Sequence, residues 1–245
     1  MADMIKLIQL NIERGKHMEV TLPFVVQAQP DVLCLQELER RFVPEFEQAV
    51  GPGIFVPLRL MQGEEEGIGI FSRHPIASHS AVQYSAGASE IQEFDGSSYD
   101  ANYASSRFIL LVADIEAQQG RFRIGTTHFP VTPKGSVTAY QREDMDRLLV
   151  ELAKLEELVL VGDFNAPRGG EIFSRLADAY TDHVPAEYKT SLDIARHRNG
   201  KDHARELADK MVDGIFSTPG YRVTNVRLQD GVSDHCAIVA EVAKQ

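Results

Sequence analysis

No part of the sequence is apolar for long enough to cross a membrane, and nothing in it marks an exported protein. None of its 245 residues falls in a run approaching the roughly 18 apolar residues that a membrane span requires. The opening stretch, MADMIKLIQL, lacks the basic start and the long apolar core of a signal peptide. We therefore expect a soluble protein in the cytoplasm.

Cysteine is nearly absent, which limits both disulfide and metal chemistry. The two cysteines, Cys34 in DVLCLQE and Cys236 in SDHCAIV, both lie in apolar, strand-like runs. Two buried, reduced thiols are therefore a simpler interpretation than a disulfide or a metal pair. A zinc site would need closely spaced histidine and cysteine ligands, and a covalent mechanism would need a serine or cysteine beside a base. The sequence has neither arrangement.

Basic residues are too few and too scattered for a protein that grips nucleic acid without sequence preference. The chain has 25 lysines and arginines against 36 aspartates and glutamates, which gives a net charge of −11. Such proteins gain most of their affinity from clustered lysine and arginine. One segment, 191–210, carries local basic residues, namely Arg196, His197, Arg198, Lys201, His203 and Arg205. Acidic residues in the same segment offset them, so a nuclease is the less favoured alternative.

Apolar residues recur with the period of a strand in some segments and of a helix in others. Strands are predicted at MIKLIQLNI, DVLCLQE, GIFVPL, GIGIFSR, RFILLVADIEA, RFRIGTTHF, LVLVGDFN, MVDGIFST, YRVTNVRLQ and CAIVAEVA. Helices are predicted at HMEVTLPFVVQAQ, RFVPEFEQAV and VTAYQREDMDRLLVELAKLEEL. The first helix is interrupted or begun at Pro23, SRHPIAS is a turn, and a turn at 118–120 joins two strands into a hairpin. These elements predict an α/β (α+β) fold with two packed mixed β-sheets flanked by helices.

Two polar segments, 84–106 and 191–210, do not fit either period and are predicted to be irregular. Loops of that length inside a compact domain are often functional, and we expect 84–106 to form a substrate-contacting flap. The rest of the chain has no evident domain linker or internal repeat. Its 43% hydrophobic residues are ample for a core.

The run LVLVGDFNAP at 158–167 ends abruptly in polar residues. Because alternate side chains of a strand share a face, Asp163 and Asn165 are predicted to lie side by side at the rim of a sheet. Other predicted strands begin or end in similar groups, namely Asn11, Glu37, His128, Asp213, Asp234 and His235. The junction of a rigid strand and a loop is a usual place for chemistry.

Carboxylates, amides and imidazoles of this kind favour metal-assisted hydrolysis of a phosphoester. Oxygen ligands suit Mg²⁺ or Mn²⁺, which would neutralise the phosphate while a carboxylate orients water and a histidine manages protons. Each residue also has a simpler interpretation. Asp163 would cap the following segment, Asn165 would serve the turn before Pro167, and Glu37 would be a solvated carboxylate. Their joint occurrence favours a shared metal–phosphate site.

Six short motifs occur in an order and at intervals that resemble the endonuclease/exonuclease/phosphatase superfamily. They are NIERG at 11–15, QE at 36–37, TTH at 126–128, GDFN at 162–165, DGIF at 213–216 and SDH at 233–235. That superfamily includes pancreatic deoxyribonuclease, apurinic endonucleases, neutral sphingomyelinases and inositol polyphosphate phosphatases. GDFN after an apolar run together with SDH before the last strand is the most specific pair. The resemblance implies a four-layer sandwich, a single catalytic domain over 1–245, and a site at one edge of the sheets.

The resemblance also implies roles for individual residues. Glu37 would be the main Mg²⁺ ligand, with Asn11 and Asp234 near or on the metal. Asp163 would orient or deprotonate the attacking water, and Asn165 would hydrogen-bond the phosphoryl oxygens. The remaining positions are His235, which would contact the phosphate and be oriented by Asp213, His128, which would act as an acid or a second phosphate-stabilising group, and Arg107, which resembles a phosphate-contacting position.

The sequence departs from the superfamily pattern at two points. Gly214 follows Asp213 where a tyrosine or histidine is usual, so packing behind the site is expected to differ. The acidic partner that some members supply to the first histidine is not obvious, and Glu66 is our candidate for it.

The substrate is the least constrained feature. The acidic charge balance and the lack of interleaved aromatic and basic residues favour a Mg²⁺-dependent phosphodiesterase or phosphatase acting on a small or lipid-derived phosphoester. A metal-dependent endonuclease or exonuclease on DNA or RNA is the alternative. A catalytically inactive binding module is a third reading, disfavoured because all the expected polar residues are present.

Overall fold

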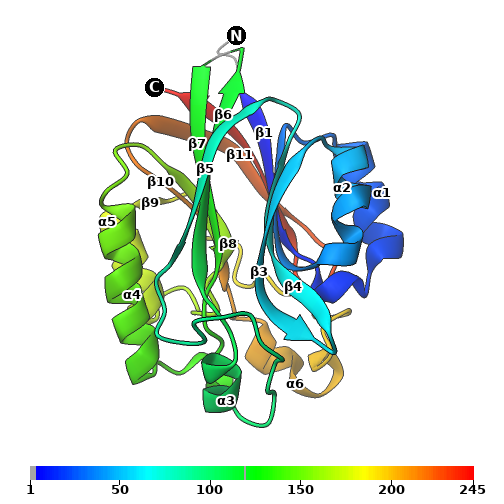
Figure 1. The fold of residues 1–245 in the computed structure, drawn as a ribbon, viewed down its shortest axis with the longest axis vertical. Helices are drawn as coiled ribbons and strands as arrows, with labels where there is room; N and C mark the ends of the chain where they lie inside the picture. The colour runs from blue at the N-terminus through cyan, green and yellow to red at the C-terminus, as the bar shows by residue number, and fades with distance from the viewer. Residues whose placement is uncertain (1–3, 119) are drawn as a thin grey trace.

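Two six-stranded β-sheets pack face to face in the computed structural model of the chain, which describes residues 4–118 and 120–245 (Figure 1). The first sheet contains, in spatial order, β11 (Tyr221–Gln229), β12 (Ala237–Lys244), β1 (Ile5–Asn11), β2 (Val32–Glu39), β4 (Glu64–Ser72) and β3 (Gly53–Met61). The second contains β5 (Ile76–Gln83), β6 (Ile109–Ala117), β7 (Gly120–His128), β8 (Val159–Asp163), β10 (Asp213–Ser217) and β9 (Thr181–Asp182). Each sheet is mixed, because one parallel pair, β1–β2 or β7–β8, lies between antiparallel pairs.

Helices cover the outer faces of both sheets and one end of the sandwich. They are α1 (Met18–Ala28), α2 (Val43–Ala49), α3 (Tyr99–Ala104), α4 (Ala139–Leu152), α5 (Glu171–Ala179) and α6 (Gly200–Leu207). Figure 1 shows α1 and α2 beside the first sheet and α4 and α5 beside the second, with α3 and α6 at the end opposite the C-terminus. The predicted α/β (α+β) fold, a four-layer sandwich, is confirmed.

Three apolar clusters fill the spaces between these layers, and the two-residue period of the strands explains how. Along β1, Ile5 and Leu7 point between the sheets, whereas Ile8 and Leu10 point outward toward α1 and α2. A third cluster joins the second sheet to α4 and α5 through residues such as Phe173. Strands that are apolar on both faces are typical of a sheet covered on both sides.

Several elements differ from the sequence prediction. The turn predicted at SRHPIAS leads directly into β5, an edge strand whose residues are mostly exposed, so its apolar signal is weak. Helix α1 begins at Met18, and Pro23 lies inside it. Helix α5 was not predicted, because it buries only Ile172, Phe173 and Leu176 over a short segment.

The two segments predicted to be irregular are partly ordered. The 84–106 segment contains α3 and runs beside β3, where the Leu60 amide donates to Gln92 and the Phe94 amide donates back to Leu60. The 191–210 segment contains α6 and forms an antiparallel bridge between Leu192 and His235. Both segments therefore hydrogen-bond to the sheets.

Three smaller predictions also have outcomes. Ala117 pairs with Gly120 across the β6–β7 hairpin as predicted, while Gln119 of the predicted turn lies outside the described residues. Cys34 and Cys236 are buried free thiols, and burial raises the pKa of Cys236 to about 12. Within residues 4–118 and 120–245, none of the helices combines the length and apolar character that a bilayer crossing needs.

Candidate active site

The candidate site lies where the apolar layer between the two sheets becomes polar. Along β8, Val159 and Val161 belong to this layer and Asp163 continues the same face. Most of the other polar strand ends continue the same layer. We call the group the strand-end cluster; its members are Asn11, Glu37, His128, Asp163, Asp213, Asp234 and His235.

Asp163 is the centre of this cluster, and its Oδ2 atom faces three groups from three other segments. The Asn11 amide donates to it at 3.1 Å, and the Nε2 atoms of His128 and His235 lie 3.6 and 3.8 Å away. Burial and the nearby charge of Asp213 raise the pKa of Asp163, although both histidines oppose the shift. Its carboxylate is thus both buried and placed to accept a proton.

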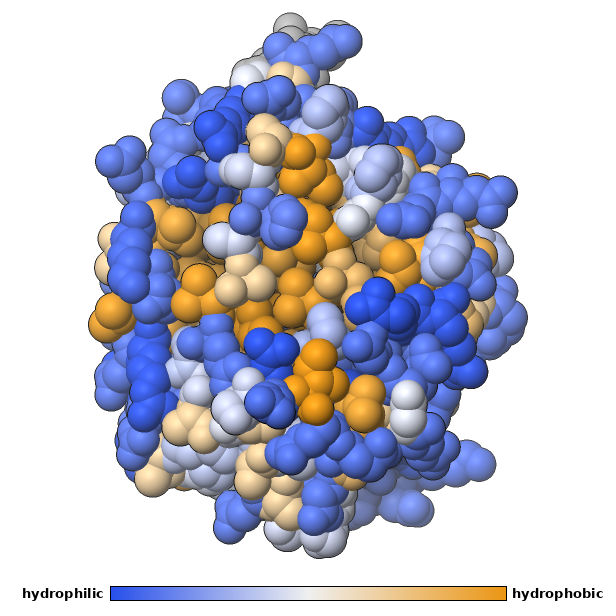
Figure 2. All heavy atoms as spheres, viewed as in Figure 1, coloured by the Kyte–Doolittle hydropathy of each residue, from blue (hydrophilic) through white to orange (hydrophobic). Residues whose placement is uncertain are grey.

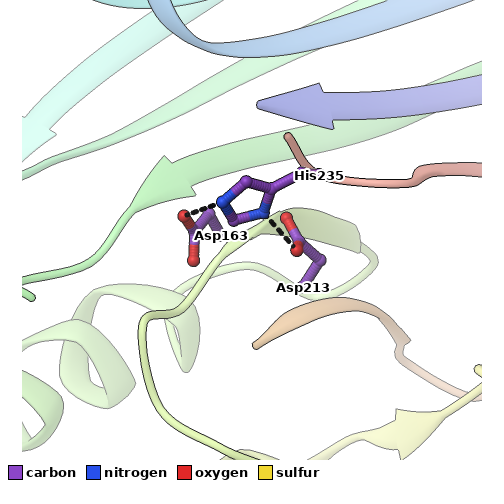
Figure 3. A group of neighbouring side chains, drawn as sticks. All are labelled: Asp163, Asp213 and His235. Carbon is purple, nitrogen blue, oxygen red and sulfur yellow. Dashed lines mark hydrogen bonds and ion pairs between the residues drawn. The ribbon is translucent and has the colours of Figure 1, made fainter. Parts of the chain in front are cut away.

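His235 is held between two carboxylates (Figure 3). Its Nδ1 lies 2.7 Å from Oδ2 of Asp213, a hydrogen-bonded pair with both side chains nearly buried. Burial would lower the pKa of His235, but Asp213 and Asp163 raise it well above its ordinary value. The Ser191 hydroxyl accepts the backbone N–H of Asp213 at 3.1 Å, so the 191–210 segment helps to fix the pair.

His128 has a different setting at the end of β7. Across the described ranges of the chain, no side chain forms a hydrogen bond with its ring, and Asp163 is its nearest ion-pair partner. Burial lowers the pKa of His128, although the charges of Asp163 and Glu37 pull it the other way. His128 is therefore the more weakly held of the two imidazoles.

Glu37 owes its place to a β-bulge. The pairing of β2 with β4 shifts register between Leu35 and Leu38, and Glu37 has a left-handed φ of 51°. Non-glycine residues rarely adopt this conformation, and its cost is often stored at functional sites. The bulge turns Glu37 toward Asn11, whose amide lies 3.3 Å from Oε1.

The carboxylates around Glu37 fit a divalent cation. Burial, with the charges of Glu37 and Glu13, raises the pKa of Asp234 to about 6 even beside His235. The buried Oε1 of Glu66 has no hydrogen-bond partner among the residues described. This end of the sandwich thus lacks positive charge for its oxygen donors, which Mg²⁺ or Mn²⁺ would supply.

A second possible ligand group is better explained as a proton-handling unit. Donor atoms of Asp163, Asp213 and His235 lie within 4.8 Å of one another, close enough to hold a metal. However, the Nδ1 atom of His235 and Oδ2 of Asp213 already share a hydrogen bond. The oxygen-rich side near Glu37 matches the preference of Mg²⁺ more closely.

Two expectations about individual residues are wrong. Glu66 does not face His128; it forms a buried ion pair with Arg59, which lies across from it on β3. Asn165 does not share a strand face with Asp163, because β8 ends at Asp163 and Asn165 is left-handed, with φ 47°. Instead the Asn165 backbone N–H donates to Asp163 Oδ1 at 2.8 Å and its amide to the Phe129 carbonyl at 2.9 Å.

Arg107 and Asp234 are placed near the site without touching the centre of the cluster. The Arg107 guanidinium donates to Gln83 at 3.1 Å and to the Pro57 carbonyl at 3.4 Å, which joins β5 to β3. Asp234 accepts a hydrogen bond from Ser233 at 3.3 Å. In the described part of the chain, no hydrogen bond or ion pair links either residue to Asp163.

Sequence reasoning missed the polar residues just behind the cluster. Gln9 and Gln36 are fully buried and hydrogen-bonded to each other, and Arg59 stacks over the Phe94 ring at 4.8 Å. The two-residue period was a usable signal for Gln9, because it shares a strand face with Asn11. Arg59 offered no such signal, since its contacts depend on a bulge in β3.

Gly214, the departure noted after Asp213, makes room for aromatic packing. A Cβ atom there would lie 2.7 Å from the Phe216 ring and 3.2 Å from the Phe164 ring. These two rings pack edge to face with centroids 5.4 Å apart. The glycine therefore lets β10 approach this pair directly behind Asp213.

Comparisons with known proteins agree with this arrangement. Three solved structures share the fold. The chain superimposes on an endonuclease/exonuclease/phosphatase from Beutenbergia cavernae with a TM-score of 0.74 and 18% identity, covering 98% of this chain and 72% of that one. For the human Nocturnin catalytic domain the values are 0.68, 17%, 100% and 96%, and for a mannosyl-6-phosphatase from Bacteroides thetaiotaomicron they are 0.67, 12%, 98% and 99%.

Sequence comparison gives the family. No curated protein matches the sequence significantly. The family model described as the Endonuclease/Exonuclease/phosphatase family matches residues 8–235, which includes every member of the strand-end cluster. The chain therefore belongs to the endonuclease/exonuclease/phosphatase family.

Proposed function

We propose that the chain is a single-domain, Mg²⁺- or Mn²⁺-dependent hydrolase that cleaves a small or lipid-derived phosphoester. Members of its family are phosphoester hydrolases and generally depend on a divalent metal. The observation that carries the proposal is the setting of Asp163, whose Oδ2 faces Asn11, His128 and His235 within 3.8 Å. A buried carboxylate with a raised pKa, surrounded by donors, is suited to take a proton from water.

Each side of the cluster has its own task in this proposal. Glu37 holds the metal, with Asn11 and Asp234 beside it, and the bound ion neutralises charge on the phosphate. Asp163 orients the attacking water and accepts its proton. The water then attacks phosphorus, the bond to the leaving oxygen breaks, and that oxygen takes up a proton.

The two histidines act on the phosphoryl group. Asp213 keeps His235 protonated, so its Nε2–H donates to a phosphoryl oxygen and stabilises the developing charge. His128 donates to a second oxygen or supplies the proton to the leaving group. Asn165 and Arg107, which lie at the rim, contact the phosphate once substrate is bound.

The substrate class rests on charge and on the relatives. The net charge of −11 disfavours long polyanions. One structural relative is named as a mannosyl-6-phosphatase, which acts on a small phosphoester, and another carries a bound sulfate anion, which is tetrahedral like phosphate. We therefore favour a small phosphoester over nucleic acid.

Hydrolysis of bis(p-nitrophenyl) phosphate and p-nitrophenyl phosphate, with and without Mg²⁺ or Mn²⁺, tests the proposal. We expect metal-dependent turnover of at least one ester by the wild type, abolished in Glu37→Ala. Glu47→Ala, an exposed carboxylate on α2, is the matched control and should behave like wild type. Turnover that is independent of metal, or equal in Glu37→Ala, would contradict the proposed role of Glu37.

A nuclease is the second candidate, favoured by one observation. Helix α6 exposes Lys201 and Arg205 at the end of the sandwich where the cluster lies (Figure 1). DNA or RNA cleavage that falls steeply with added salt, and is lost in the Arg196→Ala, Arg198→Ala double variant, would support it. A preference for small esters over nucleic acid in matched assays would favour the first proposal.

A further inference from the structure

The carboxylate of Asp213 is held from both sides, by one residue of each sheet region that meets at the cluster. Its Oδ2 pairs with Nδ1 of His235 at 2.7 Å. Its Oδ1 accepts the side-chain amide of Gln9 at 2.8 Å. Gln9 lies on β1 of the first sheet and Asp213 on β10 of the second, so this hydrogen bond crosses the space between the sheets.

Gln9 belongs to a chain of hydrogen bonds whose direction is set by Asp213. An ionised carboxylate only accepts, so the amide nitrogen of Gln9 must face Asp213. The same nitrogen donates to Oε1 of Gln36 at 2.7 Å, and Gln36 donates in turn to the Thr126 hydroxyl at 2.9 Å. All of these side chains are fully buried. The amide of Gln9 therefore cannot turn away without breaking two hydrogen bonds.

A glutamine at this position is costly if its purpose is only to hold the fold together. Ile5 and Leu7 occupy the same face of β1 and pack into the apolar layer. The Oε1 atom of Gln9 is buried and, among the residues that the structure describes, has no hydrogen-bond partner. An apolar side chain of similar size would fill the space without leaving a buried oxygen unpaired.

We propose that Gln9 is a positioning residue for the His235–Asp213 pair. It fixes the plane of the Asp213 carboxylate, so that Oδ2 points along the Nδ1–H bond and Nε2 of His235 stays directed at the phosphate. Gln9 touches neither His235 nor Asp163 in the described hydrogen bonds and ion pairs, so it acts through Asp213. This inference rests on the proposed function, because that function defines what His235 must face.

Four variants test the proposal. Gln9→Met keeps the length of the side chain and removes the donor. Asp213→Asn removes the acceptor, and the double variant removes both. Gln141→Met is the matched control, since Gln141 is another buried glutamine, on α4, whose amide donates at 2.8 Å to the Pro130 carbonyl.

We expect Gln9→Met to lower kcat by about 10- to 100-fold with KM changed by less than about threefold, because orientation is lost and substrate binding is retained. The double variant should be no slower than Asp213→Asn, since the two residues act as one unit. Gln141→Met should lower Tm as much as Gln9→Met does and keep kcat within about twofold of wild type. Equal loss of kcat in Gln141→Met, or multiplied losses in the double variant, would overturn the proposal.

A spectroscopic measurement separates this inference from the proposed function. The proton shared by Nδ1 of His235 and Asp213 should give a far-downfield proton NMR signal in the wild type, absent in Asp213→Asn. We expect Gln9→Met to shift or broaden that signal and Gln141→Met to leave it in place. An unchanged signal in Gln9→Met would overturn the positioning role, whereas a failure to hydrolyse any phosphoester would count only against the proposed function.

Discussion

His128 and His235 approach the same oxygen of Asp163, yet the protein holds them differently. Their Nε2 atoms lie 3.6 and 3.8 Å from Oδ2. His235 has Asp213 behind its other nitrogen at 2.7 Å, whereas no side chain of the described residues forms a hydrogen bond with the His128 ring. The pKa of His235 is consequently raised and that of His128 lowered.

This difference separates a charged imidazole from a neutral one within a single site. Burial lowers the pKa of both rings, so the carboxylate behind His235 decides its charge. A permanently charged His235 suits the stabilisation of phosphoryl oxygens, while a neutral, less constrained His128 suits a group that moves with the substrate. Two identical residue types thus take different roles because of the residues behind them.

The largest effect is expected from Asp163→Asn, which removes the group that both histidines face. An amide keeps the shape of the carboxylate and cannot accept a proton from water. We expect kcat to fall by about 10²- to 10⁴-fold, the usual contribution of a general base. Steady-state kinetics with saturating metal measures this loss, and activity near that of wild type would contradict the role assigned to Asp163.

Exchanging each histidine in turn breaks the comparison directly. His235→Gln removes a positive charge that Asp213 and Asp163 stabilise, so we expect a loss of about 10³-fold in kcat. His128→Gln removes a neutral ring and should cost about 10- to 100-fold. Both variants are compared at the same pH and metal concentration. Equal losses would mean that the carboxylate behind His235 is not what distinguishes the two rings.

The pH dependence of kcat/KM sharpens the same comparison. Asp163 must be ionised to act as a base, and its pKa is raised to about 6 by burial and Asp213, so activity should fall as pH drops through that value. His235 must be protonated, and its raised pKa places the alkaline limb well above neutrality. Asp213→Asn removes the main group that raises this pKa, so the alkaline limb should move to lower pH. An unmoved limb would assign it to another group.

The fold and much of the cluster follow from the two-residue period of the strands. That period places Asp163 at the end of an apolar face, and it would have placed Gln9 beside Asn11 had it been applied to the whole of β1. Glu37 follows a different rule. Its direction depends on a bulge where β2 meets β4, and pairing between distant strands leaves no local signal in the sequence.

Backbone conformation explains the remaining errors. Asn165 was assigned to the strand by extending the alternation past Asp163, but its left-handed φ ends β8 and turns the chain. Glu66 was paired with His128 because both are close to predicted strand ends, yet Arg59 on the neighbouring strand is nearer. A single sequence does not specify which buried cation reaches a buried carboxylate, since this depends on strand register.

The smallest effect is expected from Glu66→Gln, which tests the statement that His128 has no carboxylate behind it. Glu66 pairs with Arg59, and burial together with the charge of Glu37 raises its pKa to about 7. Near neutral pH the carboxyl group is already partly protonated, so glutamine resembles one of its natural forms. We expect kcat within about fivefold of wild type, since neither imidazole loses a partner. The pH profile should also keep both limbs in place. A shift as large as that in Asp213→Asn would show that Glu66 supports His128 after all, and the two histidines would then be held alike.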